Sequence, residues 1–228
     1  MRFHIRIYKL LLILGGVMSA ICMAGCEKKD SFPQPAPHRS VQTLTIVALG
    51  DSLTEGYGVE EHQAYPALLE SMLRKAGFSC TIVNAGNSGE TTSGLLSRIN
   101  RVLSLRPDIV ILCTGANDGL LGMDHHLIQN NISRMVRTFK DHQITVVLAG
   151  MKMLFNDAPS YAEPYARLYA EIAEREEILF IPFFLEGVAG EPELNLIDGI
   201  HPNAKGYRII ASAVYPHVLK AIQKRQGQ

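Results

Sequence analysis

Short apolar segments alternate with longer amphipathic ones from residue 44 onward, and this alternation limits the fold more than any other feature of the chain. The short segments are rich in β-branched and apolar residues, which is typical of strands buried on both faces. They cover residues 43–49, 80–83, 108–113, 144–149 and 178–184. Strands that alternate with helices predict a parallel sheet covered on both sides. We therefore predict a three-layer α/β fold of the flavodoxin-like type, with about five parallel strands.

Between these strands, apolar residues recur three or four positions apart, as they do on one face of a helix. The stripes lie at 65–76, 95–103, 128–139, 165–172 and 207–214. Gly77 is a natural C-cap for the first helix, and Pro107 closes the second. The last helix should begin near Asn203, and Pro216 should kink it or end it early.

Length and charge exclude some classes of function. The chain has 228 residues with 22 basic and 22 acidic side chains, enough for one domain with a buried core. Nucleic-acid binding would need a basic face, which this balance does not offer. We expect no nucleic-acid partner, and no obligate protein partner is evident.

The first 25 residues have the pattern of an export signal. Three basic residues precede an uncharged, mostly apolar run of 15 residues, 10–24, whereas a spanning helix needs about 20. The run ends in Met-Ala-Gly-Cys26, which resembles the bacterial lipoprotein signal, in which the cysteine becomes the lipid-bearing first residue. A conventional signal cut nearby and an uncleaved short anchor are the alternatives. We predict a lipoprotein signal over 1–25 and a periplasmic protein anchored to the membrane by lipid on Cys26.

Residues 26–42 predict a tether. The segment is polar, and Pro33, Pro35 and Pro37 favour an extended conformation that buries little apolar surface. Its length would be about 40–50 Å. Cleavage before Cys26 would leave 19 basic and 22 acidic residues, so electrostatics would not hold the mature protein on an anionic membrane. We expect residues 43–228 to form the folded domain.

Polar residues follow the predicted strands where ligands collect in such folds, at the carboxyl ends. Ser52 follows the first strand, residues 84–92 follow the second, and Asn117 follows the third. Asp198 and His201 come after the last strand, just before the final helix. The topology therefore predicts that these residues share one rim of the sheet.

Together they supply what a serine hydrolase needs: a nucleophile, a base, a group that orients the base, and oxyanion donors. A three-residue offset lets Asp198 reach one imidazole nitrogen of His201 and leaves the other for Ser52. Each residue also has a structural alternative. Ser52 could be a helix cap, Asp198 could cap the last helix, His201 could be a surface histidine, and Gly89 and Asn117 could be turn residues.

Ser52, Gly89, Asn117 and His201, in this chain order, resemble the quartet of the G-D-S-L/SGNH hydrolase family. The resemblance covers nearly all of residues 44–222. It is strengthened by the motifs Gly-x-Asn-Asp and Asp-Gly-Ile-His-Pro, and it is greatest for the bacterial periplasmic thioesterase/lysophospholipase/arylesterase branch.

The resemblance implies an enzyme that hydrolyses small acyl esters or thioesters through an acyl-enzyme on Ser52, without a metal or organic cofactor. It implies that His201 is the base and Asp198 orients it. The backbone of Ser52, the backbone of Gly89 and the side chain of Asn117 would bind the oxyanion. An acyltransferase or a carbohydrate deacetylase on the same scaffold is the alternative, and a binding protein on an inactive scaffold is a third.

Three further features carry expectations. Glu90 stands where the branch often has Asp, which bears on the shape of the pocket beside Gly89. Cys80 and Cys113 should be unpaired, because two strand spacings, about 9–10 Å, separate their strands, beyond the reach of a disulfide. Residues 119–123, Gly-Leu-Leu-Gly-Met, should form a loop that contributes apolar surface to an acyl pocket; the alternative is that these side chains complete the core.

Overall fold

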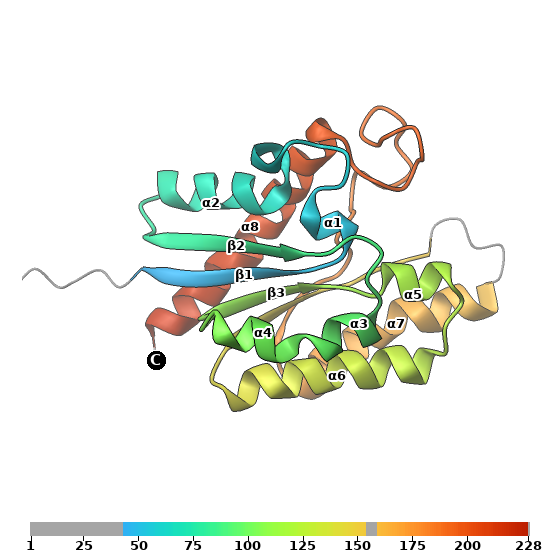
Figure 1. The fold of residues 1–228 in the computed structure, drawn as a ribbon, viewed down its shortest axis with the longest axis horizontal. Helices are drawn as coiled ribbons and strands as arrows, with labels where there is room; N and C mark the ends of the chain where they lie inside the picture. Colours follow the sequence, from blue (N-terminus) through green and yellow to red (C-terminus); the bar gives the residue numbers. More distant parts are fainter. Residues whose placement is uncertain (1–42, 154–158, 228) are drawn as a thin grey trace, which may run out of the picture. The chain divides into compact units, whose positions relative to one another are not determined.

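The computed structural model describes residues 43–153 and 159–227, and a sheet of five parallel strands lies at its centre (Figure 1). The strand order is β2-β1-β3-β4-β5, which confirms the predicted flavodoxin-like fold. The strands are β1 (Leu44–Gly50), β2 (Cys80–Gly86), β3 (Ile109–Cys113), β4 (Thr145–Ala149) and β5 (Leu179–Ile181).

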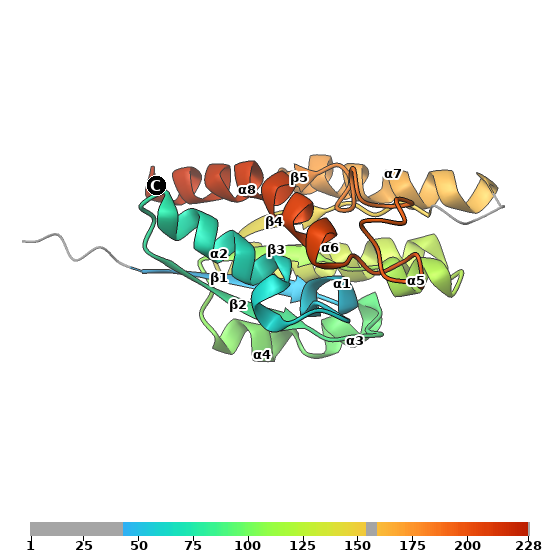
Figure 2. The same cartoon turned by 90° about the horizontal axis from the view of Figure 1, so that it is seen from above.

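Helices lie on both faces of the sheet (Figure 1, Figure 2). Helix α2 packs against α8, whereas α6 packs against α3 and α7. The helices are α1 (Ser52–Glu55), α2 (Tyr65–Lys75), α3 (Thr92–Ser97), α4 (Ile99–Ser104), α5 (Ala116–Leu120), α6 (His125–Asp141), α7 (Pro159–Glu176) and α8 (Ala204–Gln226), with a short 3₁₀ helix, η1 (Glu61–Gln63). In the part of the chain that the structure describes, no helix is long and apolar enough to cross a membrane.

The strands and the apolar stripes of the helices share one hydrophobic core. All five residues of β3 are buried, because helices cover both faces of the sheet and leave no side for polar residues. The stripe predicted for α6 is completely buried: Ile128, Ile132, Met135, Val136 and Phe139. Burial of one such side chain contributes about 1.5–3 kcal/mol, so this stripe fixes α6 against the sheet.

The stripe at 95–103 forms two short helices, α3 and α4, where the sequence predicts one. They meet at Arg98, whose backbone is not helical (φ −104°, ψ 13°). The Arg98 side chain crosses to the strand ends, where it donates to Ala85 O at 2.8 Å and Gly50 O at 3.4 Å. The apolar period does not reveal this break, because buried residues continue on both sides of it.

Two prolines act differently on their elements. Strand β5 stops at Ile181, short of the predicted 178–184, because Pro182 has no N–H for the next ladder hydrogen bond. Pro216 does not end the last helix, which continues to Gln226. Pro216 is exposed, and the buried residues of α8 on either side of it hold the helix against the core.

The two cysteines of the described chain are free and buried, as predicted. Cys80 pairs with Leu44 at the start of β1, and Cys113 pairs with Gly50 at its end. Six residues of strand, about 20 Å, therefore separate them in addition to the strand spacings. Burial raises the pKa of both thiols, which keeps them protonated and unreactive.

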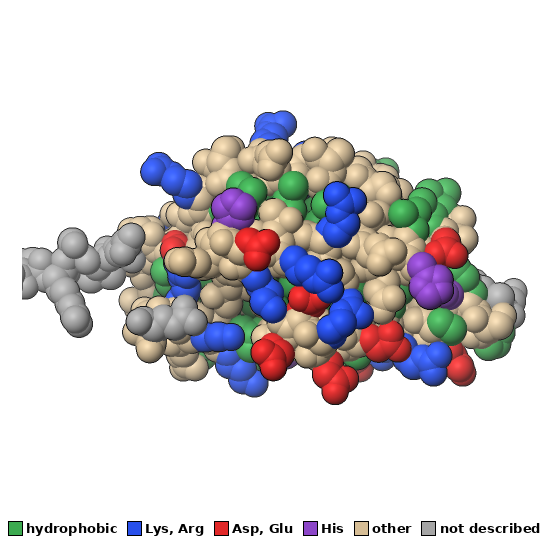
Figure 3. All heavy atoms as spheres, turned by 90° about the horizontal axis from the view of Figure 1, so that it is seen from below, with side chains coloured by type: hydrophobic (Ala, Val, Ile, Leu, Met, Phe, Trp, Pro, Cys, Tyr) green, Lys and Arg blue, Asp and Glu red, His purple; other side chains and the backbone are tan. Residues whose placement is uncertain are grey.

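Charges of both signs are mixed over the face seen from below the view of Figure 1 (Figure 3). Lys and Arg side chains alternate there with Asp and Glu side chains. That face therefore has no continuous basic field of the kind that binds a phosphate backbone.

Candidate active site

The carboxyl ends of β1, β2 and β3 lie side by side and bring three segments of the chain together. Gly50, the last residue of β1, is paired with Gly86 on one side and Cys113 on the other. The backbone N–H of Asn87 donates to Gly50 O at 3.0 Å, which joins the segment after β2 to the end of β1. The segments that carry Ser52, Gly89 and Asn117 therefore start from one edge, as predicted.

Ser52 is the first residue of α1, directly after a tight turn. The N-cap of this helix is Asp51, whose Oδ1 accepts a hydrogen bond from the Leu53 N–H at 3.0 Å. A side chain at Gly50 would collide with the neighbouring strand, since a Cβ there would lie 2.2 Å from Cys113 O. Because Asp51 caps α1, Ser52 is not needed as a cap, and its hydroxyl is free for another contact.

That contact is with His201. The Ser52 hydroxyl lies 2.9 Å from His201 Nε2, and His201 Nδ1 lies 2.7 Å from Asp198 Oδ2. A continuous chain of hydrogen bonds thus joins Asp198, His201 and Ser52. A base placed between a hydroxyl and a carboxylate is the arrangement that activates a serine.

Asp198 holds the backbone before His201 as well as its imidazole. Its Oδ1 accepts from Ile200 N–H at 2.9 Å and from His201 N–H at 3.0 Å. Burial acts to raise the pKa of Asp198, but the hydrogen bonds from His201 and Ile200 outweigh it and lower the pKa to about 2. The alternative role of Asp198, capping α8, belongs instead to Asn203, whose side chain accepts from the N–H groups of Lys205 and Gly206.

Of the residues predicted to bind an oxyanion, Gly89 would donate from its backbone and Asn117 from its side chain. Gly89 has a left-handed conformation (φ +78°), and no hydrogen-bond acceptor for its N–H is found among the described residues. Asn117 Nδ2 donates to Glu90 O at 3.0 Å, which leaves its second N–H available. The predicted residues thus carry unused donors at the edge where Ser52 lies.

A family comparison agrees with this geometry. The model of the GDSL-like Lipase/Acylhydrolase family matches residues 48–209. The chain belongs to this family. Esterase TesA of Pseudomonas aeruginosa is 34% identical over 200 residues, which are 87% of this chain and 97% of the relative. Thioesterase 1/protease 1/lysophospholipase L1 of Escherichia coli K12 is 30% identical over 174 residues, which are 76% of this chain and 82% of the relative.

The fold is also similar to that of a solved esterase. The esterase EstA from Pseudoalteromonas sp., in a structure inhibited by monoethylphosphonate, has a TM-score of 0.74 and 28% identity, and the match covers 78% of this chain and 98% of EstA. The protein is therefore a GDSL-like serine hydrolase that acts on carboxylic esters of small molecules. This confirms the class of enzyme predicted from the sequence.

The sequence analysis missed two features of this GDSL-like site, at Tyr57 and at Asp51. The Tyr57 ring lies over His201, with ring centroids 4.6 Å apart, although half of Tyr57 is exposed. Asp51 is completely buried, and burial raises its pKa to about 7, against the lowering effect of the Leu53 N–H. Its Oδ2 has no hydrogen-bond partner among the described residues. The Gly-Asp-Ser-Leu motif contains Asp51 but does not reveal this burial.

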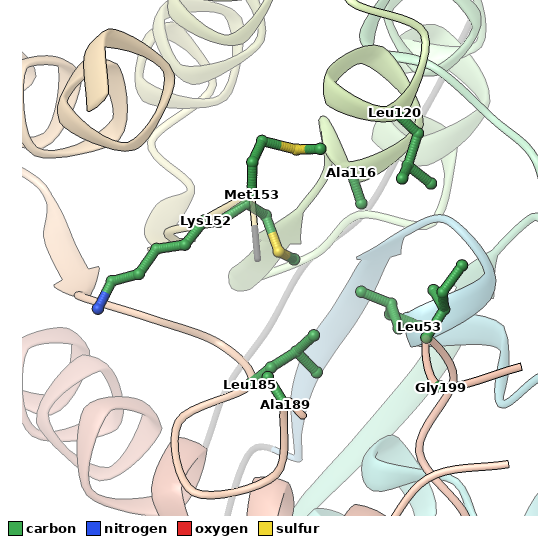
Figure 4. A pocket seen from close by; sticks show the side chains of 10 residues that line it. Leu53, Ala116, Leu120, Lys152, Met153, Leu185, Ala189 and Gly199 are labelled. Carbon is green, nitrogen blue, oxygen red and sulfur yellow. The ribbon is translucent and has the colours of Figure 1, made fainter. Parts of the chain in front are cut away.

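An apolar pocket is lined by Leu53 and Ile200, the residues directly after Ser52 and directly before His201 (Figure 4). It is lined mainly by aliphatic and methionine side chains: Leu53, Ala116, Leu120, Met151, Lys152, Met153, Leu185, Ala189 and Ile200, together with Gly199. Of the predicted segment 119–123, Leu120 lines the pocket, Leu121 is 70% exposed and does not line it, and Met123 packs against the core. One leucine of the pair therefore has the predicted position.

The described residues contain no group of three or more His, Cys, Asp or Glu side chains that could hold a metal ion.

Proposed function

We propose that Ser52 is the nucleophile of this esterase, that His201 is its general base and that Asp198 orients and stabilises His201. The observation that carries the proposal is the unbroken hydrogen-bond chain from Asp198 through His201 to Ser52. It places a proton acceptor 2.9 Å from the hydroxyl, within the range for general-base catalysis.

In the proposed reaction, Ser52 Oγ attacks the acyl carbonyl carbon while its proton passes to His201 Nε2. The carbonyl oxygen takes the negative charge and is stabilised by the N–H groups of Ser52 and Gly89 and by the second N–H of Asn117. The tetrahedral intermediate collapses to an acyl-enzyme, and His201 gives the proton to the leaving alcohol or thiol. Water, deprotonated by the same imidazole, then releases the acid.

The proposed substrates are acyl esters and thioesters whose acyl chain enters the apolar pocket. The lining of that pocket supports this choice, since aliphatic side chains favour a hydrocarbon chain over a sugar. Relatives named as an esterase and as a thioesterase/lysophospholipase support both leaving-group classes.

Labelling with an alkyl fluorophosphonate tests the nucleophile. We expect one covalent adduct on the wild-type protein, on the peptide that contains Ser52, and none on Ser52→Ala. Ser104→Ala removes an exposed hydroxyl at the end of α4. This variant should be labelled as the wild type is. Labelling that persists in Ser52→Ala would exclude Ser52 as the nucleophile.

We also propose that residues 1–25 are a lipoprotein signal, that Cys26 carries lipid, and that residues 26–42 tether the hydrolase domain, 43–228, to a membrane in the periplasm. Residues 1–42 lie outside the described part of the chain, so this proposal is supported by the sequence alone. Cells fed a labelled fatty acid should incorporate label into the wild type and into Cys22→Ser, but not into Cys26→Ser. Label in Cys26→Ser would exclude that cysteine as the lipid site.

A further inference from the structure

We propose that three charged residues, Glu55, Glu90 and Arg98, position the oxyanion donors of this enzyme. They act through the segment 87–90, which carries Gly89, and through the side chain of Asn117. The proposal rests on the oxyanion role proposed above for these two donors.

Glu55 holds the amino-terminal side of Gly89. Its carboxylate accepts hydrogen bonds from both the N–H (2.9 Å) and the hydroxyl of Ser88, the residue directly before Gly89. Glu55 is the last residue of α1, the helix that begins with Ser52. The segment that carries one oxyanion donor is therefore tied to the helix that carries the nucleophile.

Arg98 holds the carboxyl-terminal side of Gly89 through Glu90. Its Nε lies 2.8 and 2.9 Å from the two carboxylate oxygens of Glu90, and its Nη2 lies 2.5 Å from Oε2. The same Nη2 donates to Ala85 O at 2.8 Å. The Glu90 side chain is only 8% exposed. The pair is shielded from water and anchored to the end of β2, unlike a surface ion pair, which stabilises little.

Glu90 is also the link between the two donors. Its carbonyl oxygen accepts the hydrogen bond from Asn117 Nδ2, and its own N–H donates to Asn87 O at 3.2 Å. Its side chain lies against Gly94, where an added Cβ would come within 2.9 Å of Glu90 Cγ. A movement of Glu90 would therefore displace Gly89, its direct neighbour, together with Asn117.

Loss of this ion pair should affect turnover more than substrate binding. Oxyanion donors act on charge that develops in the transition state, and a displacement of about 1 Å costs up to about 10²-fold in rate. We expect Arg98→Met to lower kcat by about 10–100-fold with KM nearly unchanged. Arg101→Met, which removes an exposed arginine from the next turn, should keep the wild-type kcat.

A double-mutant cycle with Asn117→Ala separates positioning from general stability. If Arg98 acts through the oxyanion donors, the factor by which Arg98→Met lowers kcat should be at least about threefold smaller in the Asn117→Ala background than in the wild type. Equal factors in both backgrounds would overturn the proposal. So would a lowered melting temperature in Arg98→Met with an unchanged kcat.

Glu55→Ala keeps the test decisive if Arg98→Met does not fold, since Glu55 is exposed. We expect kcat to fall by about 3–10-fold at an unchanged melting temperature, whereas Glu61→Ala, a nearby exposed acid, should have no effect. A wild-type kcat in Glu55→Ala would overturn the proposal that Glu55 positions Gly89. An unchanged kcat in Asn117→Ala alone would reject the oxyanion assignment itself, which is a separate result.

Discussion

The two halves of the proposed active site are built in different ways. In the base half, Asp198 and His201 are three residues apart and bind each other through backbone and side chain. In the oxyanion half, the contacts join residues 33 positions apart, from Ser88 to Glu55, and 27 positions apart, from Asn117 to Glu90. The base half is thus specified by a short stretch of sequence, whereas the oxyanion half depends on how distant elements pack.

Removing the carboxylate from the base half should have the largest effect. Asp198→Asn should lower kcat by about 10⁴-fold, because a neutral amide does not hold the required tautomer of His201 or stabilise its charged form. Esterase kinetics at saturating substrate measure this. Glu193→Gln, an exposed neighbour in the same loop, should retain full activity. A loss of less than about tenfold would show that His201 does not depend on Asp198.

In the oxyanion half, removal of one donor should cost less, since other donors remain. Asn117→Ala should lower kcat by about 10²–10³-fold with little change in KM. Steady-state kinetics on one ester separate the two constants. A raised KM with an unchanged kcat would make Asn117 a substrate-binding residue and would weaken the contrast between the two halves.

Asp51, in the turn between β1 and α1, should make the stability of the protein depend on pH. The unfolded chain loses the Asp51 proton near pH 4, whereas burial raises the folded pKa to about 7. The folded state therefore binds more protons between these values, and the free energy of unfolding falls as pH rises from about 4 to about 7.

Asp51→Asn should remove this dependence and stabilise the protein by about 1–4 kcal/mol relative to wild type above about pH 7. Denaturant unfolding at about pH 5 and about pH 8 measures the difference. The exposed change Asp141→Asn should give the same difference at both pH values. A pH-independent effect of Asp51→Asn would show that Asp51 is ionised throughout the range.

The smallest effect concerns the acyl pocket, next to the oxyanion half. Each methylene covered by Leu120 should contribute up to about 0.8 kcal/mol, or about fourfold in kcat/KM. Leu120→Ser should therefore flatten a preference for medium over acetyl chains. Leu121→Ser, at the exposed neighbour that does not line the pocket, should leave it intact. An equal loss on all chain lengths in Leu120→Ser would place the acyl chain elsewhere.

Much of the fold follows from local pattern. Buried strands without polar alternation and helices with one apolar face predict the parallel sheet and its covering helices. The predicted bounds of helices and strands are wrong where an unbroken apolar pattern contains a break in the backbone or a proline. The predicted helix breaks at Arg98, whose side chain binds the carbonyl groups of distant strand ends. Helix α8 continues through Pro216, where buried residues on both sides hold it against the core.

The sequence alone determined the fold class, the class of enzyme and the positions proposed for the nucleophile, base and orienting acid. The fold class depends on residue type and periodicity, whereas the class of enzyme and the site positions depend on the resemblance of short motifs to those of a known family. All of these are local properties of the chain. Only the tertiary structure decided how Glu90, Arg98 and Glu55 meet around Gly89, which leucine lines the pocket, and how far Asp51 is buried. Such contacts arise when β1, β2 and α1 pack together, and side chains far apart in the sequence acquire partners that no local pattern records.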